Sequence, residues 1–199
     1  MNYIYESLKR YPIISAIKNE EGLKACLKSK CEVVFILHGN ICTIEEIVDT
    51  VKSAKKIAIV HVDLIEGLSN TDIAVQYIAS NTLADGIIST KSNMLKSAKE
   101  RGLMTIQRVF MIDSIAYKNF HTHVNKGQID FVEILPGIMP KILKNLTKSS
   151  NIPVIAGGLI SDEEDIQLSL ESGAIAVSTT NEDLWNYGNN ILLNNKYFL

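Results

Sequence analysis

The sequence predicts an α/β fold, a compact (β/α)8 TIM-type barrel that forms a single domain over residues 1–188. Short apolar runs alternate with segments of helical periodicity at intervals of about 20 to 30 residues, which favours parallel strands joined by right-handed crossovers. The chain has 199 residues, of which 46% are apolar and 21% charged, enough for one substantial core but short for such a barrel. The alternative is an open doubly wound sheet, but no glycine-rich fingerprint follows the first apolar run.

The predicted elements follow one another in a regular order. Strands are expected at 13–17, 33–37, 57–64, 86–89, 104–110, 130–135, 152–156 and 174–180. Residues 1–11 form a short helix or arm, and further helices are expected to begin near 19, 43, 71, 92, 113, 137 and 161. A last turn surrounds Trp185. Residues 189–199 are an asparagine-rich tail, interpreted as a frayed or partner-dependent end or as a terminal helix that packs on the barrel.

Two of these helices carry the spacing of a capping box at their start. Thr43 is followed three residues later by Glu46, and Ser161 is followed in the same way by Glu164. In a capping box the two side chains satisfy backbone N–H groups that the first helical turn leaves free. At the other end of a helix, Gly102 follows the periodic segment and fits the residue after a C-cap.

The composition excludes several classes of protein. The net charge of −2 gives no general field for nucleic acid. Cys26, Cys31 and Cys42 lack CxxC spacing, so reduced thiols and no metal framework are expected. No signal-peptide core or membrane-length apolar run is present, and the protein is therefore expected in the cytoplasm. His121 and His123 lie two residues apart on a predicted helix and do not share a face, so a metal site is not expected.

Small and hydroxyl residues follow the last two predicted strands. The seventh strand stops at Gly157 and Gly158, which can turn sharply and allow a ligand to approach the backbone. The eighth strand ends in Ser178, Thr179 and Thr180. Each end is followed by a predicted helix start, so backbone N–H groups should converge there, and barrels often hold a phosphate between these strands. The sequence therefore predicts a phosphate site, although the two glycines could simply make a tight turn.

Polar residues also follow the C-terminal ends of the other predicted strands. They are Lys18, His38, Asp63, Glu66, Ser89, Arg108 and Glu133. In a barrel these ends form one rim, where sites are built. We expect a polar ligand at this rim; the alternative is that the residues satisfy one another, Arg108 with Glu133 and Lys18 with an acid across the barrel. His61, whose orientation is uncertain, is interpreted as a buried structural histidine.

The residue types at this rim allow either binding or catalysis. Arg108 and Lys18 can contact a charged ligand group, and the carboxylates can accept hydrogen bonds from hydroxyls. Asp63 and Glu133 with Lys18 could also perform acid–base chemistry, but no nucleophile–base pair has a recognisable signature. No catalytic residue and no metal ligand is assigned. The basic residues are spread over the predicted helices, as is typical of a solvated surface. The alternative is that a cluster contributes to a basic stripe for phosphates, because local patches matter more than net charge.

Several blocks of the chain match a known family. They are PIISAIK (12–18), CEVVFIL (31–37), HVDLIEGLS (61–69), DGIISTKSN (85–93), TIQRVFMIDS (105–114), VEILPGIMPK (132–141), IPVIAGGLI (152–160) and AVSTTNEDLW (176–185). Through these blocks the sequence resembles the glycerol uptake operon antiterminator regulatory proteins of bacteria, which respond to glycerol 3-phosphate. The resemblance covers nearly the full chain and leaves the asparagine-rich tail outside.

The resemblance implies a compact barrel that binds glycerol 3-phosphate as an effector, needs no cofactor and does not convert its ligand. It also implies that the liganded protein binds the mRNA leader of glycerol-utilisation genes and prevents a terminator hairpin from forming. Two alternatives stay open at this point: an enzyme, such as a lyase or isomerase, that acts on a small phosphorylated substrate, and a protein that only binds a metabolite. A homodimer is compatible with the apolar positions on the helices.

Overall fold

Eight parallel strands close into a barrel in the computed structural model, which describes residues 3–124 and 127–187 and, of residues 121–123, the backbone alone. Strands adjacent in the sequence are adjacent in the barrel. The strands are β1 (Ile13–Ile17), β2 (Val33–Ile36), β3 (Ile57–His61), β4 (Gly86–Ser89), β5 (Met104–Phe110), β6 (Phe131–Leu135), β7 (Val154–Gly157) and β8 (Ala176–Thr179). The predicted (β/α)8 barrel is therefore confirmed.

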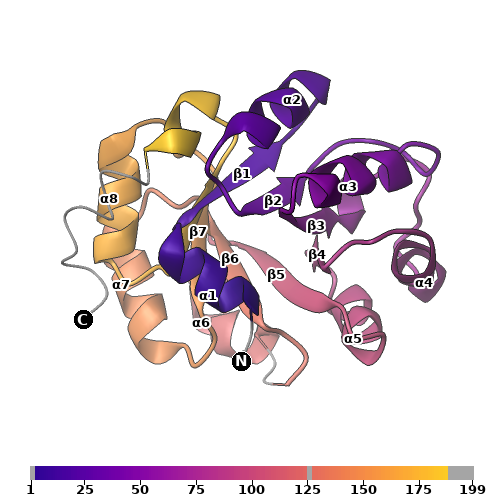
Figure 1. The fold of residues 1–199 in the computed structure, drawn as a ribbon. Coiled ribbons are helices and arrows are strands. Elements are labelled where there is room, and N and C mark those ends of the chain that lie inside the picture. Colours follow the sequence, from indigo (N-terminus) through magenta and orange to yellow (C-terminus); the bar gives the residue numbers. More distant parts are fainter. Residues whose placement is uncertain (1–2, 125–126, 188–199) are drawn as a thin grey trace.

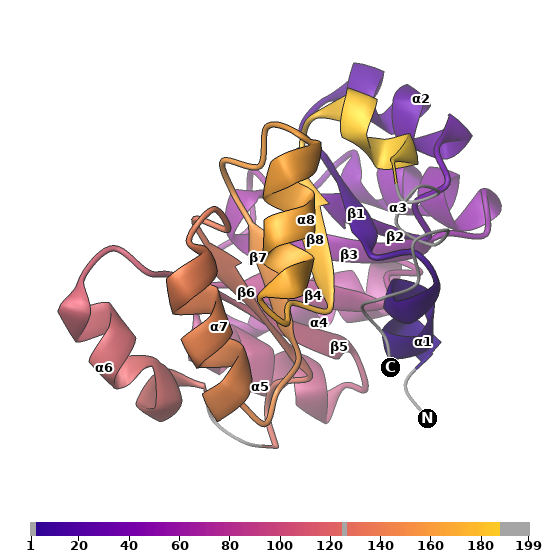
Figure 2. The same cartoon turned by 90° about the vertical axis from the view of Figure 1, so that its left-hand side faces the viewer.

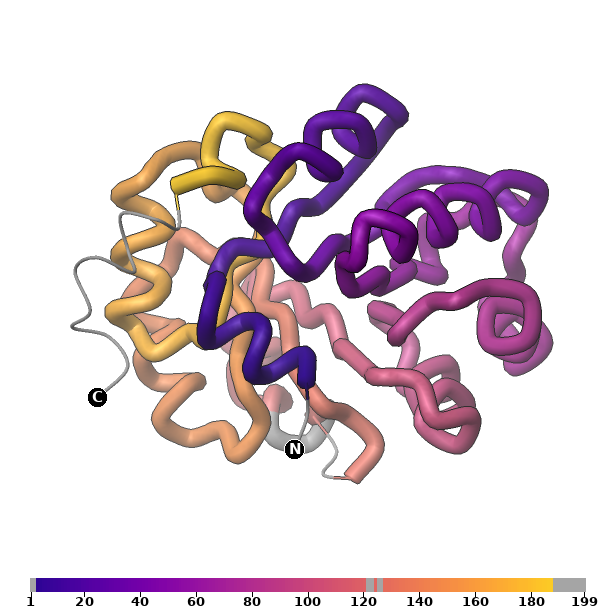
Figure 3. The backbone as a smooth tube through the Cα atoms, viewed as in Figure 1, coloured from indigo at the N-terminus to yellow at the C-terminus, as the bar shows by residue number. Residues whose placement is uncertain are grey.

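The barrel is closed by the pairing of its last strand with its first. Ile13 of β1 lies opposite Val177 of β8, and Ser15 lies opposite Thr179. In Figure 3 the yellow C-terminal segment accordingly lies beside the indigo start of the chain. This closure places the ends of β7 and β8 next to the end of β1, where the sequence predicts a phosphate site.

A helix follows each of the first seven strands and lies on the outside of the barrel. These helices are α2 (Glu20–Lys28), α3 (Ile44–Ser53), α4 (Asp72–Asn81), α5 (Ser92–Glu100), α6 (Ser114–His123), α7 (Pro140–Ser149) and α8 (Glu163–Glu171). Figure 2 shows α6, α7 and α8 in succession along one side. After β8 comes only a short 3-10 helix, η2 (Glu182–Asn186), whose Trp185 is buried and donates from Nε1 to the carbonyl oxygen of Thr179 at 2.9 Å.

The strand residues divide into two apolar layers because successive side chains point to opposite faces. One layer fills the inside of the barrel and includes Phe35, Ile59 and Phe131, whereas the other packs between strands and helices. Ile4 and Leu8 of α1 (Tyr3–Arg10) belong to the inner layer. Helix α1 therefore covers the N-terminal mouth, as Figure 1 shows, and leaves the opposite mouth for a ligand.

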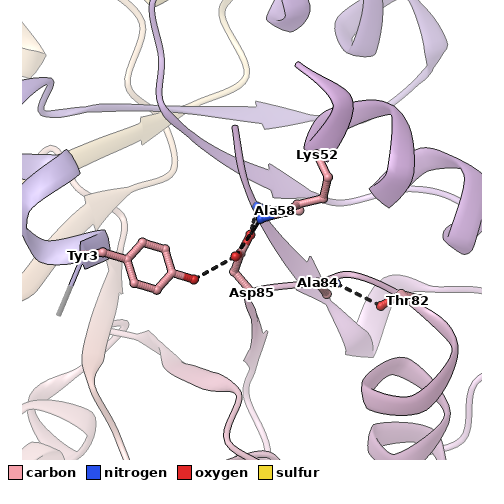
Figure 4. A network of polar contacts seen from close by, with 6 residues as sticks. All are labelled: Tyr3, Lys52, Ala58, Thr82, Ala84 and Asp85. Atoms are coloured by element: carbon pink, nitrogen blue, oxygen red, sulfur yellow. Dashed lines mark hydrogen bonds and ion pairs between the residues drawn. The ribbon is translucent and has the colours of Figure 1, made fainter. Parts of the chain in front are cut away.

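A carboxylate network fastens α1 and α3 to the strands at that covered end (Figure 4). Asp85, just before β4, accepts hydrogen bonds from the Tyr3 hydroxyl at 2.7 Å and from the Ala58 backbone N–H at 2.8 Å. Lys52 Nζ lies 2.6 Å from the same carboxylate. Burial and the hydrogen bond to Asp85 raise the pKa of Tyr3 above its ordinary value. One side chain thus joins four elements of the fold.

The third strand is shorter than predicted. β3 ends at His61, and Val62–Leu64 forms a 3-10 turn, η1. The turn directs Asp63 toward the next strand end, where its carboxylate accepts from the Ser89 hydroxyl at 2.5 Å and from the Thr90 backbone N–H at 2.7 Å. These bonds favour the turn over a continued extended strand.

Both predicted capping boxes differ from the structure. Thr43 makes no side-chain cap to α3; its Oγ1 accepts instead from the Asn40 backbone N–H at 3.0 Å. Helix α8 is capped by Asp162 rather than Ser161, through a 2.9 Å bond from the Asp165 N–H. The Asp165 carboxylate in turn accepts from the Ser161 N–H. A carboxylate at position 162 competes successfully with the serine because it is the stronger acceptor.

The predicted asparagine-rich tail, residues 189–199, lies outside the described residues. Among the helices that the structure does describe, none has both the length and the apolar character that a membrane crossing requires.

Candidate ligand-binding site

A cavity of about 420 Å³ opens at the C-terminal ends of the strands, beside the junction of β7, β8 and β1. Its size lies within the usual range for small-molecule sites. Its walls come from strand ends and from the loop between β7 and α8. The lining residues are Ala16, Leu37, Arg108, Glu133, Gly158, Leu159, Ile160, Ser161, Ser178, Thr179 and Thr180.

The β7–α8 loop presents backbone donors to this cavity. Gly158 has a φ of +73° and Leu159 a φ of +63°, so the chain turns in the left-handed region at two successive residues. Within the described chain, the backbone N–H groups of Leu159, Ile160 and Thr180 have no hydrogen-bond partner. Unpaired N–H groups that face a concavity are suited to an anion. The two strand ends that the sequence singles out are thus brought to one cavity, though this does not test phosphate binding.

The helix starts contribute less to an anion site than the sequence suggests. The first turn of α8 already carries Glu163, Glu164 and Asp165, whose charges complement the positive end of the helix dipole. The segment after β8 is the 3-10 helix η2 rather than an α-helix, and Asn181 caps it by accepting from the Asp183 N–H at 3.2 Å. The donors available to a ligand are therefore those of the loops.

Two of the five residues predicted to contact phosphate have another role in the structure. Ser178 is buried, and its hydroxyl donates a 2.6 Å hydrogen bond to Glu133 Oε1. Gly157 does not line the cavity. A Cβ at Gly157 would lie 2.5 Å from Ser178 Oγ and 2.6 Å from Glu133 Oε1. The missing side chain at 157 therefore leaves room for the hydrogen bond between Ser178 and Glu133.

Arg108 and Glu133 form an ion pair in the cavity wall. Arg108 Nε lies 2.6 Å from Glu133 Oε2, and the two side chains are only 12% and 1% exposed. The sequence analysis gave this pairing of Arg108 with Glu133 as the alternative to ligand binding, and the pairing is present. Both residues nevertheless line the cavity. The terminal nitrogens of Arg108 make no hydrogen bond with another described residue. The guanidinium can therefore donate to a ligand while its Nε holds Glu133.

The other predicted rim residues do not join this cavity. Asp63 is held by Ser89 and Thr90 in an adjoining turn. Glu66 is exposed and belongs to an isolated bridge with Asn40. Lys18 is exposed and, within the part of the chain that the structure describes, forms no ion pair, so the expected acid across the barrel is not observed.

His38 also lies apart from the cavity lining. It follows β2 and is half-buried, and its Nε2 is buried without a hydrogen-bond partner in the described chain. Burial lowers the pKa of His38. A neutral imidazole is the form that such surroundings favour.

The interpretation of His61 as a buried histidine is confirmed, and the structure also gives its orientation, which the sequence left uncertain. His61 is 2% exposed, and it follows Ile57 and Ile59, which belong to the inner layer, so alternation places it inside the barrel. Burial, and then the nearby charge of Arg108, lower the pKa of His61 to about 4. Among the described residues, its buried Nδ1 has no hydrogen-bond partner. The same orientation follows from the sequence when every second residue is assigned to one face, starting from Ile57.

The described residues include no group of three or more histidine, cysteine or acidic side chains placed to hold a metal ion. Cys26 and Cys31 are buried and Cys42 is exposed, and all three are free thiols. Burial raises the pKa of Cys31 to about 12, so this thiol stays protonated at neutral pH.

Residues 13–185 match the family model described as glycerol-3-phosphate responsive antiterminator. The chain belongs to this family. Because the match spans β1 to η2, it includes every wall of the cavity. The resemblance drawn from the sequence blocks is confirmed.

Three known proteins are similar to this chain over most of its length. The uncharacterized protein YgcP of Escherichia coli strain K12 is 44% identical over 185 residues, which cover 93% of this chain and 97% of that protein. The crystal structure of a glycerol uptake operon antiterminator regulatory protein from Listeria monocytogenes has a TM-score of 0.83 and 38% identity, covering 87% of this chain and 94% of the other. An antiterminator-related protein from Thermotoga maritima has a TM-score of 0.77 and 28% identity, covering 88% and 98%.

Enzymes with the same barrel are far less similar in sequence than the antiterminators. An aldolase shares 15% identity at a TM-score of 0.71, and a deoxyribose phosphate aldolase from Aeropyrum pernix shares 13% at 0.69. Such likeness shows the fold alone, because barrels of this kind carry many unrelated activities.

Proposed function

We propose that this antiterminator-family protein binds glycerol 3-phosphate in the cavity and, in the liganded state, binds the mRNA leader of glycerol-utilisation genes. Binding there prevents a terminator hairpin from forming, so transcription continues; the protein acts in the cytoplasm and performs no turnover. The observation that carries the proposal is one cavity with two kinds of recognition group. Unpaired backbone N–H groups line one part, and the Arg108–Glu133 pair lines another.

The ligand has matching chemistry at its two ends. A phosphate is recognised by the N–H groups of Leu159, Ile160 and Thr180, which need no charge of their own to bind an anion. The two hydroxyls are recognised by Glu133, which accepts, and by the free guanidinium nitrogens of Arg108, which donate. Glycerol lacks the phosphate and inorganic phosphate lacks the hydroxyls, so each should bind more weakly.

RNA binding that depends on the ligand requires that glycerol 3-phosphate favour one state of the protein over another. A coupling factor of about 10 to 100 in RNA affinity, which is typical of allosteric proteins, corresponds to about 1–3 kcal/mol. The β7–α8 loop is the element that contributes donors to the ligand, and it is therefore the segment whose state the ligand would change.

The test is a titration of labelled leader RNA with the full-length protein, with and without saturating glycerol 3-phosphate. Glycerol and inorganic phosphate serve as matched ligand controls. RNA affinity that rises at least tenfold only with glycerol 3-phosphate supports the proposal. Equal RNA affinity without ligand and with glycerol 3-phosphate, glycerol or inorganic phosphate would show that the ligand does not control RNA binding. The absence of any RNA binding would contradict the proposed antiterminator function.

The second candidate function is an enzyme that acts on a small phosphorylated substrate. Its supporting observations are the Arg108–Glu133 pair in the cavity wall and the buried His61, whose pKa is lowered by burial and by the charge of Arg108. A carboxylate and a neutral imidazole are groups that can transfer protons. Incubation with triose and pentose phosphates, followed by mass spectrometry, tests it. Turnover that Glu133→Gln abolishes would support the enzyme, and unchanged substrates after long incubation would discard it.

A further inference from the structure

Three lysines form a stripe along the outer surface of α7. Lys141, Lys144 and Lys148 are spaced by three and four residues, which places them on one side of the helix. All three are exposed, whereas Leu143 and Leu146 on the opposite side are buried. From Lys141 to Lys148 the stripe is about 10 Å long, at about 1.5 Å of rise per residue.

The charges of this stripe are not neutralised by neighbouring acids. Among the described residues, Lys141, Lys144 and Lys148 form no ion pair. Some basic residues of other helices are paired instead: Lys52 with Asp85, and Lys99 with Asp130. Arg101 is paired with Asp72 in the same way. Net charge does not reveal this difference, because the chain as a whole is slightly acidic.

The surroundings of α7 are also poor in acids. Between Ser114 and Pro153 the only acidic residues are Asp130 and Glu133, and both are already paired. Helix α6 lies next to α7 in the row of outer helices (Figure 2), and its Lys118 is exposed. On the other side of α7, the start of α8 is acidic, with Asp162 to Asp165 in succession. The positive surface therefore has a clear boundary.

We propose that the lysine stripe of α7 is the surface that contacts the phosphates of the leader RNA. This inference rests on the proposed function and adds the location of the RNA. Lysines that lack protein partners release counterions when they contact phosphates, and this release drives binding. Asn145 is exposed on the same helix, and its side-chain amide supplies a neutral donor for phosphate or sugar oxygens.

The entry to α7 is also joined to the ligand cavity. The backbone N–H of Gly137, in the β6–α7 loop, donates to the carbonyl oxygen of Gly158 at 3.1 Å. Ser169 of α8 donates from its hydroxyl to the Gly137 carbonyl oxygen at 3.2 Å. Gly158 lines the cavity. A ligand that orders the β7–α8 loop therefore acts on the loop that positions the RNA-binding helix, which gives the coupling a direct structural route.

The experiment compares two triple variants in the full-length protein. The first is Lys141→Gln, Lys144→Gln, Lys148→Gln; the matched control is Lys24→Gln, Lys28→Gln, Lys55→Gln, which removes the same charge from exposed positions on and after α2 and α3. Leader RNA affinity is measured with saturating glycerol 3-phosphate at several salt concentrations. Calorimetry with glycerol 3-phosphate and thermal unfolding show whether each variant keeps its fold and cavity.

We expect the α7 variant to bind RNA at least about tenfold more weakly at physiological salt, with a log–log salt slope smaller by about 2, at ~0.7 per phosphate contact. The control variant should bind like the wild type. The assignment of RNA to α7 would be overturned if the α7 variant bound RNA as tightly as the wild type. It would also be overturned if both variants lost the same amount of RNA affinity. A wild type that binds no RNA would overturn the proposed function and this surface together.

A last arm separates RNA from an acidic protein partner. Poly-glutamate of the same total charge as the RNA is added as a competitor to the wild-type complex. We expect it to compete at least about tenfold less well than unlabelled leader RNA, because it lacks the sugar and base groups. Equal competition would assign the stripe to acidic partners in general and overturn its assignment to RNA.

Discussion

The hydroxyl of Ser178 donates a 2.6 Å hydrogen bond to Oε1 of Glu133 through the space that a side chain at position 157 would fill. Gly157→Ala should therefore move Ser178 or Glu133, since a new Cβ would lie within 2.6 Å of both oxygens. We expect a loss of about 2 kcal/mol in the free energy of unfolding, as for other overpacked sites. We also expect at least tenfold weaker binding of glycerol 3-phosphate, measured by calorimetry.

Gly102→Ala is the control for this substitution. Gly102 has a φ of +77°, and no atom lies within 4 Å of the position that a Cβ would take there, so the cost is backbone strain alone, about 1 kcal/mol. The ligand affinity of this variant should equal that of the wild type. If Gly157→Ala also retained wild-type affinity, the Ser178–Glu133 contact would have no part in ligand binding.

Thr180 offers a direct test of the phosphate position. It is exposed at the cavity edge, and its proposed contribution is the backbone N–H alone. Thr180→Glu places a carboxylate where the phosphate should lie and should abolish binding through like-charge repulsion, with little change in stability. Thr180→Val keeps the N–H and the side-chain volume, so it should bind normally. Calorimetry that finds equal affinities in the two variants would remove the phosphate from this corner.

Gly158 and Ser178 are less suitable positions for that test. A Cβ at Gly158 would lie 3.1 Å from Leu135 Cδ2 on a backbone with a φ of +73°. A larger acid at Ser178 would be buried against Glu133. Substitutions at either position disturb the barrel itself, so a loss of ligand binding there would have two explanations.

Removal of one partner of the Arg108–Glu133 pair should destabilise the protein more than removal of both charges. Arg108→Met leaves the Glu133 carboxylate buried without its cation and should cost about 3 kcal/mol in unfolding free energy. Arg108→Met combined with Glu133→Gln removes the unpaired charge and should recover at least half of that loss. Urea unfolding of the two single variants and the double variant measures this coupling, and additive losses would contradict it.

The stability of the protein should decrease in mild acid because of His61. Its pKa is lowered to about 4 by burial and by Arg108, while the unfolded chain keeps a value near 6.5. Between these values the unfolded state binds more protons, so stability is present above about pH 6.5 and is lost as the pH falls toward 4. From pH 7 to pH 5 this group alone should account for roughly 2 kcal/mol.

His61→Asn provides the comparison for the acid effect, because asparagine does not titrate. Urea unfolding at pH 7 and pH 5 should show a smaller loss of stability for the variant than for the wild type. An identical loss in both proteins would show that other groups cause the acid sensitivity.

Asp85 should be a major determinant of stability at the end of the barrel that α1 covers. Asp85→Ala leaves the Ala58 N–H without its acceptor and Lys52 without its ion pair, and should cost about 3 kcal/mol. Glu32→Ala, which breaks the exposed pair with Arg10, is the comparison and should change stability little. Chemical denaturation of both variants checks the difference. Similar losses would mean that the Asp85 network adds nothing beyond a surface charge pair.

The barrel and the end at which its cavity opens can be predicted from the amino-acid sequence alone. Apolar runs such as 104–110 predicted β5 with its observed bounds, because strand and helix periodicities are properties of neighbouring residues. The pairs Gly157–Gly158 and Thr179–Thr180 indicated the end at which the cavity opens, because the ends of parallel strands lie on one rim. Because side chains alternate along a strand, His61 must share the inward face of Ile57 and Ile59. The sequence interpretation had left the orientation of His61 uncertain.

The partners of the polar residues, in contrast, become evident only in the folded barrel. It paired Arg108 with Glu133, directed Asp63 into a turn with Ser89, and left Lys18 outside the cavity lining. It also showed that, within the described chain, the lysines of α7 form no ion pair, whereas Lys52, Lys99 and Arg101 each pair with an aspartate. Local patterns report which face a residue occupies. Hydrogen bonds and ion pairs depend on distances between segments far apart in the chain, and those distances are set only when the barrel closes.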